Sequence, residues 1–131
     1  MKISVITIVY NDVTHIKSTL LSVINQTAFN NIEYIVVDGA SSDGTSEIIT
    51  SYAGEISQYI REKDTGIYNA MNKGLAIATG DYIQFINSGD SYSSIDVVER
   101  IVKKIGNDRP DVIYGHYRET RGDDFVGPVI P

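Results

Sequence analysis

The chain has 131 residues, 42% of them hydrophobic and 21% charged, which fits a soluble globular protein with one modest core. It has no cysteine and only two histidines, so disulfides and thiolate catalysis are excluded and a zinc site is disfavoured. The net charge of -6 argues against nucleic acid as a partner, because binding its phosphates needs clustered Lys and Arg.

The first half of the chain alternates between strand and helix patterns. Residues 3–10 form an apolar, β-branched run, which is typical of a strand covered on both faces of a parallel sheet. Apolar residues then recur at helical spacing over 16–24. The next expected elements are a strand at 34–37, a short helix at 47–52 and a strand at 57–61.

The second half continues this alternation. The expected elements are a helix at 67–78, a buried strand at 82–86, a helix at 98–105 and a fifth strand at 111–114. The pattern fades after Gly115, and residues 127–131 belong to no expected element. Alternating strands and helices predict an α/β fold with a mostly parallel sheet. Because no repeat or linker divides the chain, we expect a single domain over residues 1–131.

Polar residues gather where three of the expected strands end. They lie at Tyr10-Asn11, at 38–44 and at 87–90, and a turn at 64–66 is in a position to join them. Ligands of open parallel sheets bind beyond the carboxyl ends of the strands, so these loops predict a site at one edge. Taken singly, each loop is also an ordinary turn, because Gly tolerates positive φ and Asx side chains bond nearby backbone.

Two common nucleotide-binding motifs are missing from the sequence. No Gly-x-Gly-x-x-Gly pattern follows the first expected strand, and no Gly-Lys-Ser/Thr loop occurs. An acidic chain that binds a nucleotide therefore needs another way to neutralise the phosphates. A divalent cation held by carboxylates would supply it.

Four motifs resemble, in order and spacing, those of the family 2 glycosyltransferases, including members that build bacterial surface polysaccharides. The motifs are residues 4–11, residues 36–45, residues 66–74 followed by 78–83, and residues 87–90. The resemblance covers roughly residues 3–118. It implies a GT-A fold, which is a Rossmann-like, mostly parallel sheet flanked by helices, and a nucleoside-diphosphate sugar as donor.

The resemblance also implies roles for individual residues. Tyr10 would pack against the base with Ile8 beside it, and Asp38 would accept a hydrogen bond from the base ring, which favours uracil. Asp90 would bind Mg²⁺ or Mn²⁺ at the two phosphates. The further residues expected in the donor pocket are Asp64, Asn72 and Lys73, the last as a phosphate contact.

The motifs depart from the family pattern at several positions. A proline common in the first motif is absent, and Gly39 stands where the family usually has a second acid. Asn87 and Gly89 stand where acids are frequent, so Asp90 is the one carboxylate of the last motif. The family's catalytic base lies in a later, acceptor-binding part. We assign it to no residue and expect a chain that is truncated at its C-terminus.

The main hypothesis is a metal-assisted, inverting transfer of a sugar from a UDP-sugar to a saccharide or lipid-linked saccharide acceptor. A non-catalytic nucleotide-sugar-binding module is the alternative that the reduced metal motif allows. A sugar-nucleotide pyrophosphorylase ranks last, because residues 11–15 form no basic glycine-rich loop. No apolar run approaches the roughly 20 residues of a membrane span, and no signal peptide is evident. We therefore expect a cytoplasmic protein, which contacts the inner face of the membrane only through a missing C-terminal part.

Overall fold

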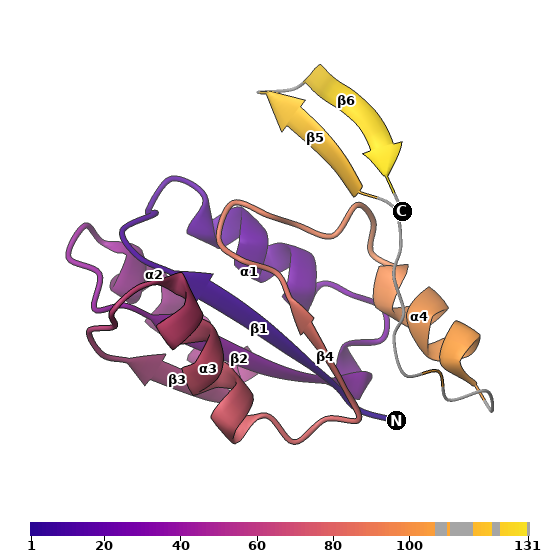
Figure 1. Cartoon of the computed structure of the whole chain (residues 1–131), viewed down its shortest axis with the longest axis horizontal. Helices are drawn as coiled ribbons and strands as arrows, with labels where there is room; N and C mark the ends of the chain where they lie inside the picture. Colours follow the sequence, from indigo (N-terminus) through magenta and orange to yellow (C-terminus); the bar gives the residue numbers. More distant parts are fainter. Residues whose placement is uncertain (107–109, 111–116, 122–123, 131) are drawn as a thin grey trace.

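The computed structural model describes residues 1–106, 110, 117–121 and 124–130. Every element expected before residue 106 is present, and Figure 1 shows their arrangement. In chain order they are β1 (Ile3–Val9), α1 (Ile16–Ile24), β2 (Ile32–Asp38), α2 (Thr45–Thr50), β3 (Gln58–Arg61), α3 (Ile67–Ile77), β4 (Tyr82–Phe85) and α4 (Val97–Ile105). Single 3-10 turns at Phe29–Asn31 and Ala53–Glu55 precede β2 and β3.

The four strands form one sheet in the order β3-β2-β1-β4, and each pair of neighbours is parallel. The pairing of β1 with β2 runs without a break from Ile3 opposite Ile32 to Val9 opposite Asp38. Because all four strands point the same way, their carboxyl ends and the loops that follow lie along one edge of the sheet. This is the edge at which the sequence predicts the site.

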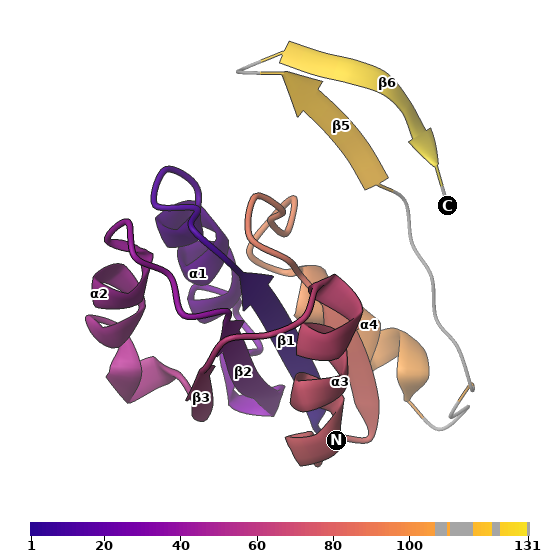
Figure 2. The same ribbon diagram turned by 60° about the vertical axis from the view of Figure 1, so that its left-hand side comes forward.

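Helices cover both faces of the sheet (Figure 2). Alternate residues of β1 separate the two layers, because successive strand side chains point to opposite faces. Val5 and Val9 pack in one cluster with Leu20 of α1 and Val98 of α4, whereas Ile6 packs on the other face in a cluster with Ala70 of α3. The core thus fixes β1, and with it the start of each site loop.

The C-terminal region differs from the expectation. Residues 117–121 form β5 (Tyr117–Arg121), which pairs antiparallel with β6 (Asp124–Ile130), although no element was expected at 127–131. Gly127 and Pro128 explain why β6 was not predicted, because both residues are unfavourable inside a strand. The strand expected at 111–114 lies outside the described residues. Among the helices that the structure describes, none has the length and apolar character required to cross a membrane.

Candidate functional site

Hydrogen bonding of the sheet type continues past the ends of the strands and fixes the first residue of three loops. The Gly39 amide donates to the Val9 carbonyl at 3.0 Å, and the Ser88 amide donates to the Ile8 carbonyl at 3.0 Å. The Glu62 amide likewise donates to the Asp38 carbonyl at 3.1 Å. The polar loops therefore start from backbone that the sheet itself holds.

A cleft of about 440 Å³ opens at this edge. Its walls come from the end of β1 and its exit, from the loop and first turns around the start of α3, and from the exit of β4. Tyr10 is 64% exposed and Ile67 is 51% exposed, so the cleft offers apolar surface beside its polar groups. The lining residues are 8–12, Asp64, Gly66, Ile67, Ala70, Asn87 and Ser88.

Three of the seven predicted site residues line this cleft, namely Ile8, Tyr10 and Asp64. They come from β1 and its exit and from the loop before α3, so the structure brings together residues more than fifty positions apart in sequence. The other four predicted residues are not among its lining residues. They are Asp38, Asn72, Lys73 and Asp90.

Asp38 is positioned differently from the expectation that it contacts the base. Its side chain has no exposed surface. Its Oδ1 accepts hydrogen bonds from the Ser41 amide at 2.9 Å and the Ser41 hydroxyl at 2.7 Å. Its Oδ2 accepts from the hydroxyls of Ser46 and Tyr59. Both oxygens are thus engaged inside the protein, and a direct bond to a bound base would require breaking these contacts.

These hydrogen bonds also set the charge of Asp38. Burial alone would raise the pKa of this carboxyl, but the hydrogen bonds from Ser46, Ser41 and Tyr59 outweigh burial and lower the pKa below its ordinary value. Burial and the bond to Asp38 raise the pKa of the Tyr59 hydroxyl to about 12, so Tyr59 remains a donor. Asp38 is a charged anchor beneath the loop that follows β2.

Two loops are joined directly at the rim. The Asn11 amide donates to the Ser41 hydroxyl at 2.9 Å, and the Asn11 side-chain oxygen accepts from the Ser42 amide at 2.8 Å. Asn11 and Ala40 both have positive φ, of 46° and 67°, which is uncommon outside glycine. Arg61 closes the loop from β3 by donating to the Ser41 carbonyl at 2.9 Å. The exits of β1 and β2 therefore form one cross-linked unit.

Lys73 and Asn72 lie on α3. The Lys73 ammonium donates to the Lys63 carbonyl at 3.0 Å and pairs with the Glu62 carboxylate at 3.1 Å. It thus ties α3 to the loop that carries Asp64, and the phosphate contact expected of Lys73 stays a prediction. Asn72 is exposed on the same helix, and its expected role stays a prediction.

The loop after β4 places Asp90 at its tip. The Asp90 amide donates to the Asn87 carbonyl at 2.8 Å, and the Asp90 carbonyl accepts from the Thr19 hydroxyl at 2.8 Å. Asp90 is an exposed residue. The Oδ1 of Asn87 is buried and has no hydrogen-bond partner within the described residues. In that part of the chain, no group of three or more His, Cys, Asp or Glu side chains could hold a metal ion.

Eight residues that line the cleft are not among the predicted site residues, and three of these eight, Asp12, Ile67 and Asn87, have side chains suited to contact a ligand. Asn87 stands where the family often has an acid, and its amide oxygen is also a possible metal ligand and hydrogen-bond acceptor. Asp12 lines the cleft and accepts a hydrogen bond from Ser88 at 2.8 Å. Ile67 is apolar yet exposed at the start of α3. The sequence shows that this residue is apolar, but not that it is exposed.

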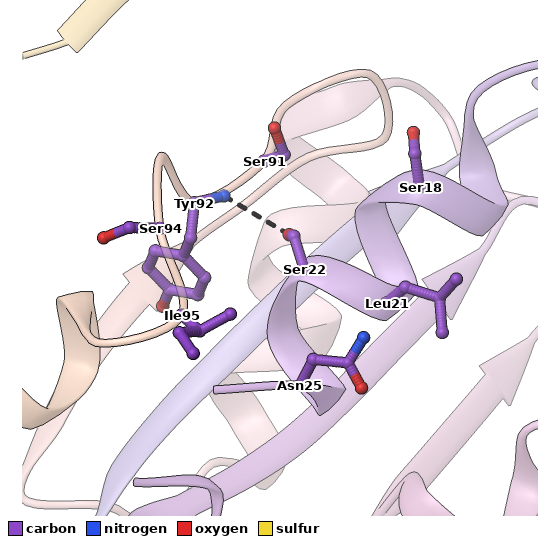
Figure 3. A pocket seen from close by; sticks show the side chains of 8 residues that line it. All are labelled: Ser18, Leu21, Ser22, Asn25, Ser91, Tyr92, Ser94 and Ile95. Atoms are coloured by element: carbon purple, nitrogen blue, oxygen red, sulfur yellow. Dashed lines mark hydrogen bonds between the residues drawn. The ribbon is translucent and has the colours of Figure 1, made fainter. Parts of the chain in front are cut away.

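A second pocket, of about 360 Å³, lies between α1 and the loop that leads to α4 (Figure 3). Its lining is made of hydroxyls and an amide with Leu21, Tyr92 and Ile95, and none of the predicted site residues belongs to it. The Tyr92 amide donates to Ser22 at 3.3 Å across this pocket. It offers no acid or base, so the chemistry points to the cleft at the sheet edge.

Comparison with solved structures shows the same architecture. The Staphylococcus aureus protein TarS, residues 1–349 in complex with UDP-GlcNAc, superposes with a TM-score of 0.74 and 26% identity over 82% of this chain and 32% of that one. The mannosyltransferase PcManGT of Pyrobaculum calidifontis, in complex with GDP-Man and Mn²⁺, gives a TM-score of 0.72 and 25% identity over 80% of this chain and 32% of that one. The parallel sheet and its flanking helices are a GT-A fold, as expected.

Comparison of sequences gives the family. An uncharacterised glycosyltransferase of Mycobacterium tuberculosis is 37% identical over 82% of this chain and 41% of its own length. The glycosyltransferase GlyA of Streptococcus pneumoniae is 36% identical over 88% of this chain and 17% of its own length. The chain thus spans less than half of these relatives. The model of glycosyl transferase family 2 matches residues 4–129, and the chain belongs to this family.

Proposed function

We propose that this chain is the donor-binding part of a glycosyltransferase that moves a sugar from a UDP-sugar to a saccharide or lipid-linked saccharide acceptor. The observation that carries the proposal is the cleft at the carboxyl edge of the sheet, where an exposed aromatic ring, a carboxylate and a buried amide oxygen line one volume. Its size of about 440 Å³ suits a ligand of this kind. TarS with UDP-GlcNAc and PcManGT with GDP-Man support the same class of donor here.

In this proposal the base lies against Tyr10. An aromatic side chain that is 64% exposed at a cleft offers a flat apolar face on which a base stacks. Ile8 is partly buried beside it, and Ile67 provides a second apolar wall. The sugar and the diphosphate then extend towards the loop that follows β4.

The residues of that loop fit a divalent cation. Asp90 offers an exposed carboxylate, and Asn87 offers a buried amide oxygen with no partner in the described part of the chain. Oxygen donors are those that Mg²⁺ and Mn²⁺ prefer, and Mg²⁺ needs only one or two protein carboxylates when phosphate and water complete its shell. Bound there, either ion supplies positive charge against the departing diphosphate.

The proposed transfer inverts the anomeric centre. A base removes the proton of the acceptor hydroxyl, whose oxygen attacks the anomeric carbon on the side opposite the departing UDP. We assign the donor side of this reaction to the cleft and assign the base to no residue of this chain. Asp90 and Asn87 would hold the cation at the diphosphate, and the Tyr10 ring would lie against the nucleobase.

Isothermal titration of the chain with UDP and Mn²⁺ tests the proposal. We expect binding that EDTA removes, and a loss of about tenfold or more in affinity for Asp90→Asn, because one charge-assisted contact contributes about 1.5–3 kcal/mol. Glu55→Gln, an acid-to-amide change at an exposed residue outside the cleft, is the matched control. Absence of UDP binding would refute the proposal, and binding that ignores EDTA would favour the non-catalytic module.

A further inference from the structure

Gly39, which stands where the family usually has a second acid, lies next to two residues that line the cleft, Tyr10 and Asp64. Gly39 is not among the glycines with positive φ, so its backbone conformation accepts any residue. A Cβ atom at this position would lie 2.9 Å from Oδ2 of Asp64 and 3.2 Å from Cδ1 of Tyr10. The first distance is shorter than real Cβ contacts, so the space for a side chain at position 39 is already taken by the Asp64 carboxylate.

Asp64 is held at this place by its own loop. Its Oδ1 accepts a hydrogen bond from the Gly66 amide at 3.2 Å, which leaves Oδ2 as the oxygen that lies over Gly39. Gly66 has a φ of 132°, a value that strongly favours glycine, so the shape of this turn depends on glycine at this position. The carboxylate is therefore oriented by the turn that leads into α3.

The same loop is fastened to α3 at two further points. The Thr65 amide donates to the Asn69 side-chain oxygen at 3.1 Å, and the Lys73 ammonium donates to the Lys63 carbonyl at 3.0 Å. These bonds flank Asp64 on both sides in the sequence. A carboxylate mounted in this way has lost most of its rotational freedom before any ligand arrives.

Repulsion between like charges favours a single ionised carboxylate in the space beside Gly39. Two carboxylates about 3 Å apart cannot both stay ionised, because like charges raise the pKa of one of them. Gly39 removes the second acid of the family pattern, and Asp64 brings a carboxylate to the same point from another element, beside the Tyr10 ring. Asp38, which keeps the first acid of the pattern, is buried beneath the loop and unavailable.

We propose that Asp64, seated in the space left open by Gly39, selects the base of the donor nucleotide. An ionised carboxylate only accepts hydrogen bonds, so it pairs with the ring N3–H of uracil. Cytosine has a lone pair at N3, so a carboxylate that faces N3 is repelled there and can accept only from the neighbouring 4-amino group. This inference rests on the proposed function and assigns its base selectivity to Asp64.

The test compares UDP with CDP, which differ in the base at N3 and at its neighbouring substituent. Each is titrated in the presence of Mn²⁺ into the wild type, Asp64→Asn and the control Glu55→Gln. We expect the wild type and the control to bind UDP about 10 to 100 times more tightly than CDP, as one charge-assisted hydrogen bond implies. Asp64→Asn should bring this ratio close to one, because its amide donates as well as accepts. Thermal unfolding confirms that each variant folds.

A second variant moves the acid and separates base selection from a merely structural role. In the double variant Gly39→Asp, Asp64→Gly, the carboxylate comes from position 39, and we expect the UDP preference to return to at least about tenfold. Gly39→Asp alone places two acids at one point and should weaken UDP binding, because the new side chain crowds and repels the Asp64 carboxylate.

The outcomes distinguish the two proposals. If the wild type binds neither nucleotide, the proposed function fails and this inference fails with it. If the wild type binds UDP but does not prefer it to CDP, or if Asp64→Asn keeps the wild-type ratio, the donor site stands and the role of Asp64 is refuted.

Discussion

At the scale of single residues, Asp38 shows how a motif residue can act from beneath the site. Its carboxylate accepts from the hydroxyls of Ser41, Ser46 and Tyr59, which come from the loop after β2, from α2 and from β3. Tyr59→Phe removes one of these donors, and we expect the free energy of unfolding to fall by about 1 kcal/mol. Urea unfolding followed by circular dichroism measures the change. Tyr68→Phe, at a residue that is 78% exposed, should have no measurable effect.

The charge of Asp38 makes a separate prediction for pH. Its pKa is lower in the folded chain than in the unfolded chain, so the stabilisation is complete above the unfolded value of about 3.9 and disappears as pH falls through the folded value. The amide of Asp38→Asn carries no charge, so this variant lacks the pH-dependent stabilisation that the ionised carboxylate gives. We therefore expect the wild type to exceed Asp38→Asn in unfolding free energy at pH 7, with the difference shrinking below about pH 4. A difference that stays constant down to pH 2 would contradict this account.

At the scale of elements, the turn between α3 and β4 packs directly on β1. A Cβ atom at Gly80 would lie 2.6 Å from the backbone nitrogen of Ser4 and 3.0 Å from the carbonyl oxygen of Lys2. Backbone cannot give way as a side chain can, so Gly80→Ala should lower the free energy of unfolding by about 1–3 kcal/mol. Gly54→Ala, whose Cβ would meet nothing within 4 Å, is the matched control for chemical denaturation. Equal effects of the two changes would rule out this packing argument.

At the scale of the whole molecule, the sheet was predictable because its signals are local. The apolar run at 3–10 and the helical spacing at 16–24 each indicate an element without reference to the rest of the chain. Parallel strands then place Ile8, Tyr10 and Asp64 at one edge, as expected. The fate of Asp38 was not predictable in this way. Its burial depends on partners from three other segments, and no spacing in the sequence reveals that they meet.

The extension of the sheet hydrogen bonds beyond β1 has a consequence for motion. The amides of Gly39 and Ser88 are bonded to the carbonyls of Val9 and Ile8, which both belong to β1, the strand that runs between the two core clusters. Neither amide can open to solvent without loosening the central strand, so both should exchange their hydrogens almost as slowly as the sheet interior. The starts of the loops that follow β2 and β4 therefore belong to the same cooperative unit as the core. We therefore expect the backbone at Gly39 and Ser88 to have the same conformation before and after a ligand binds.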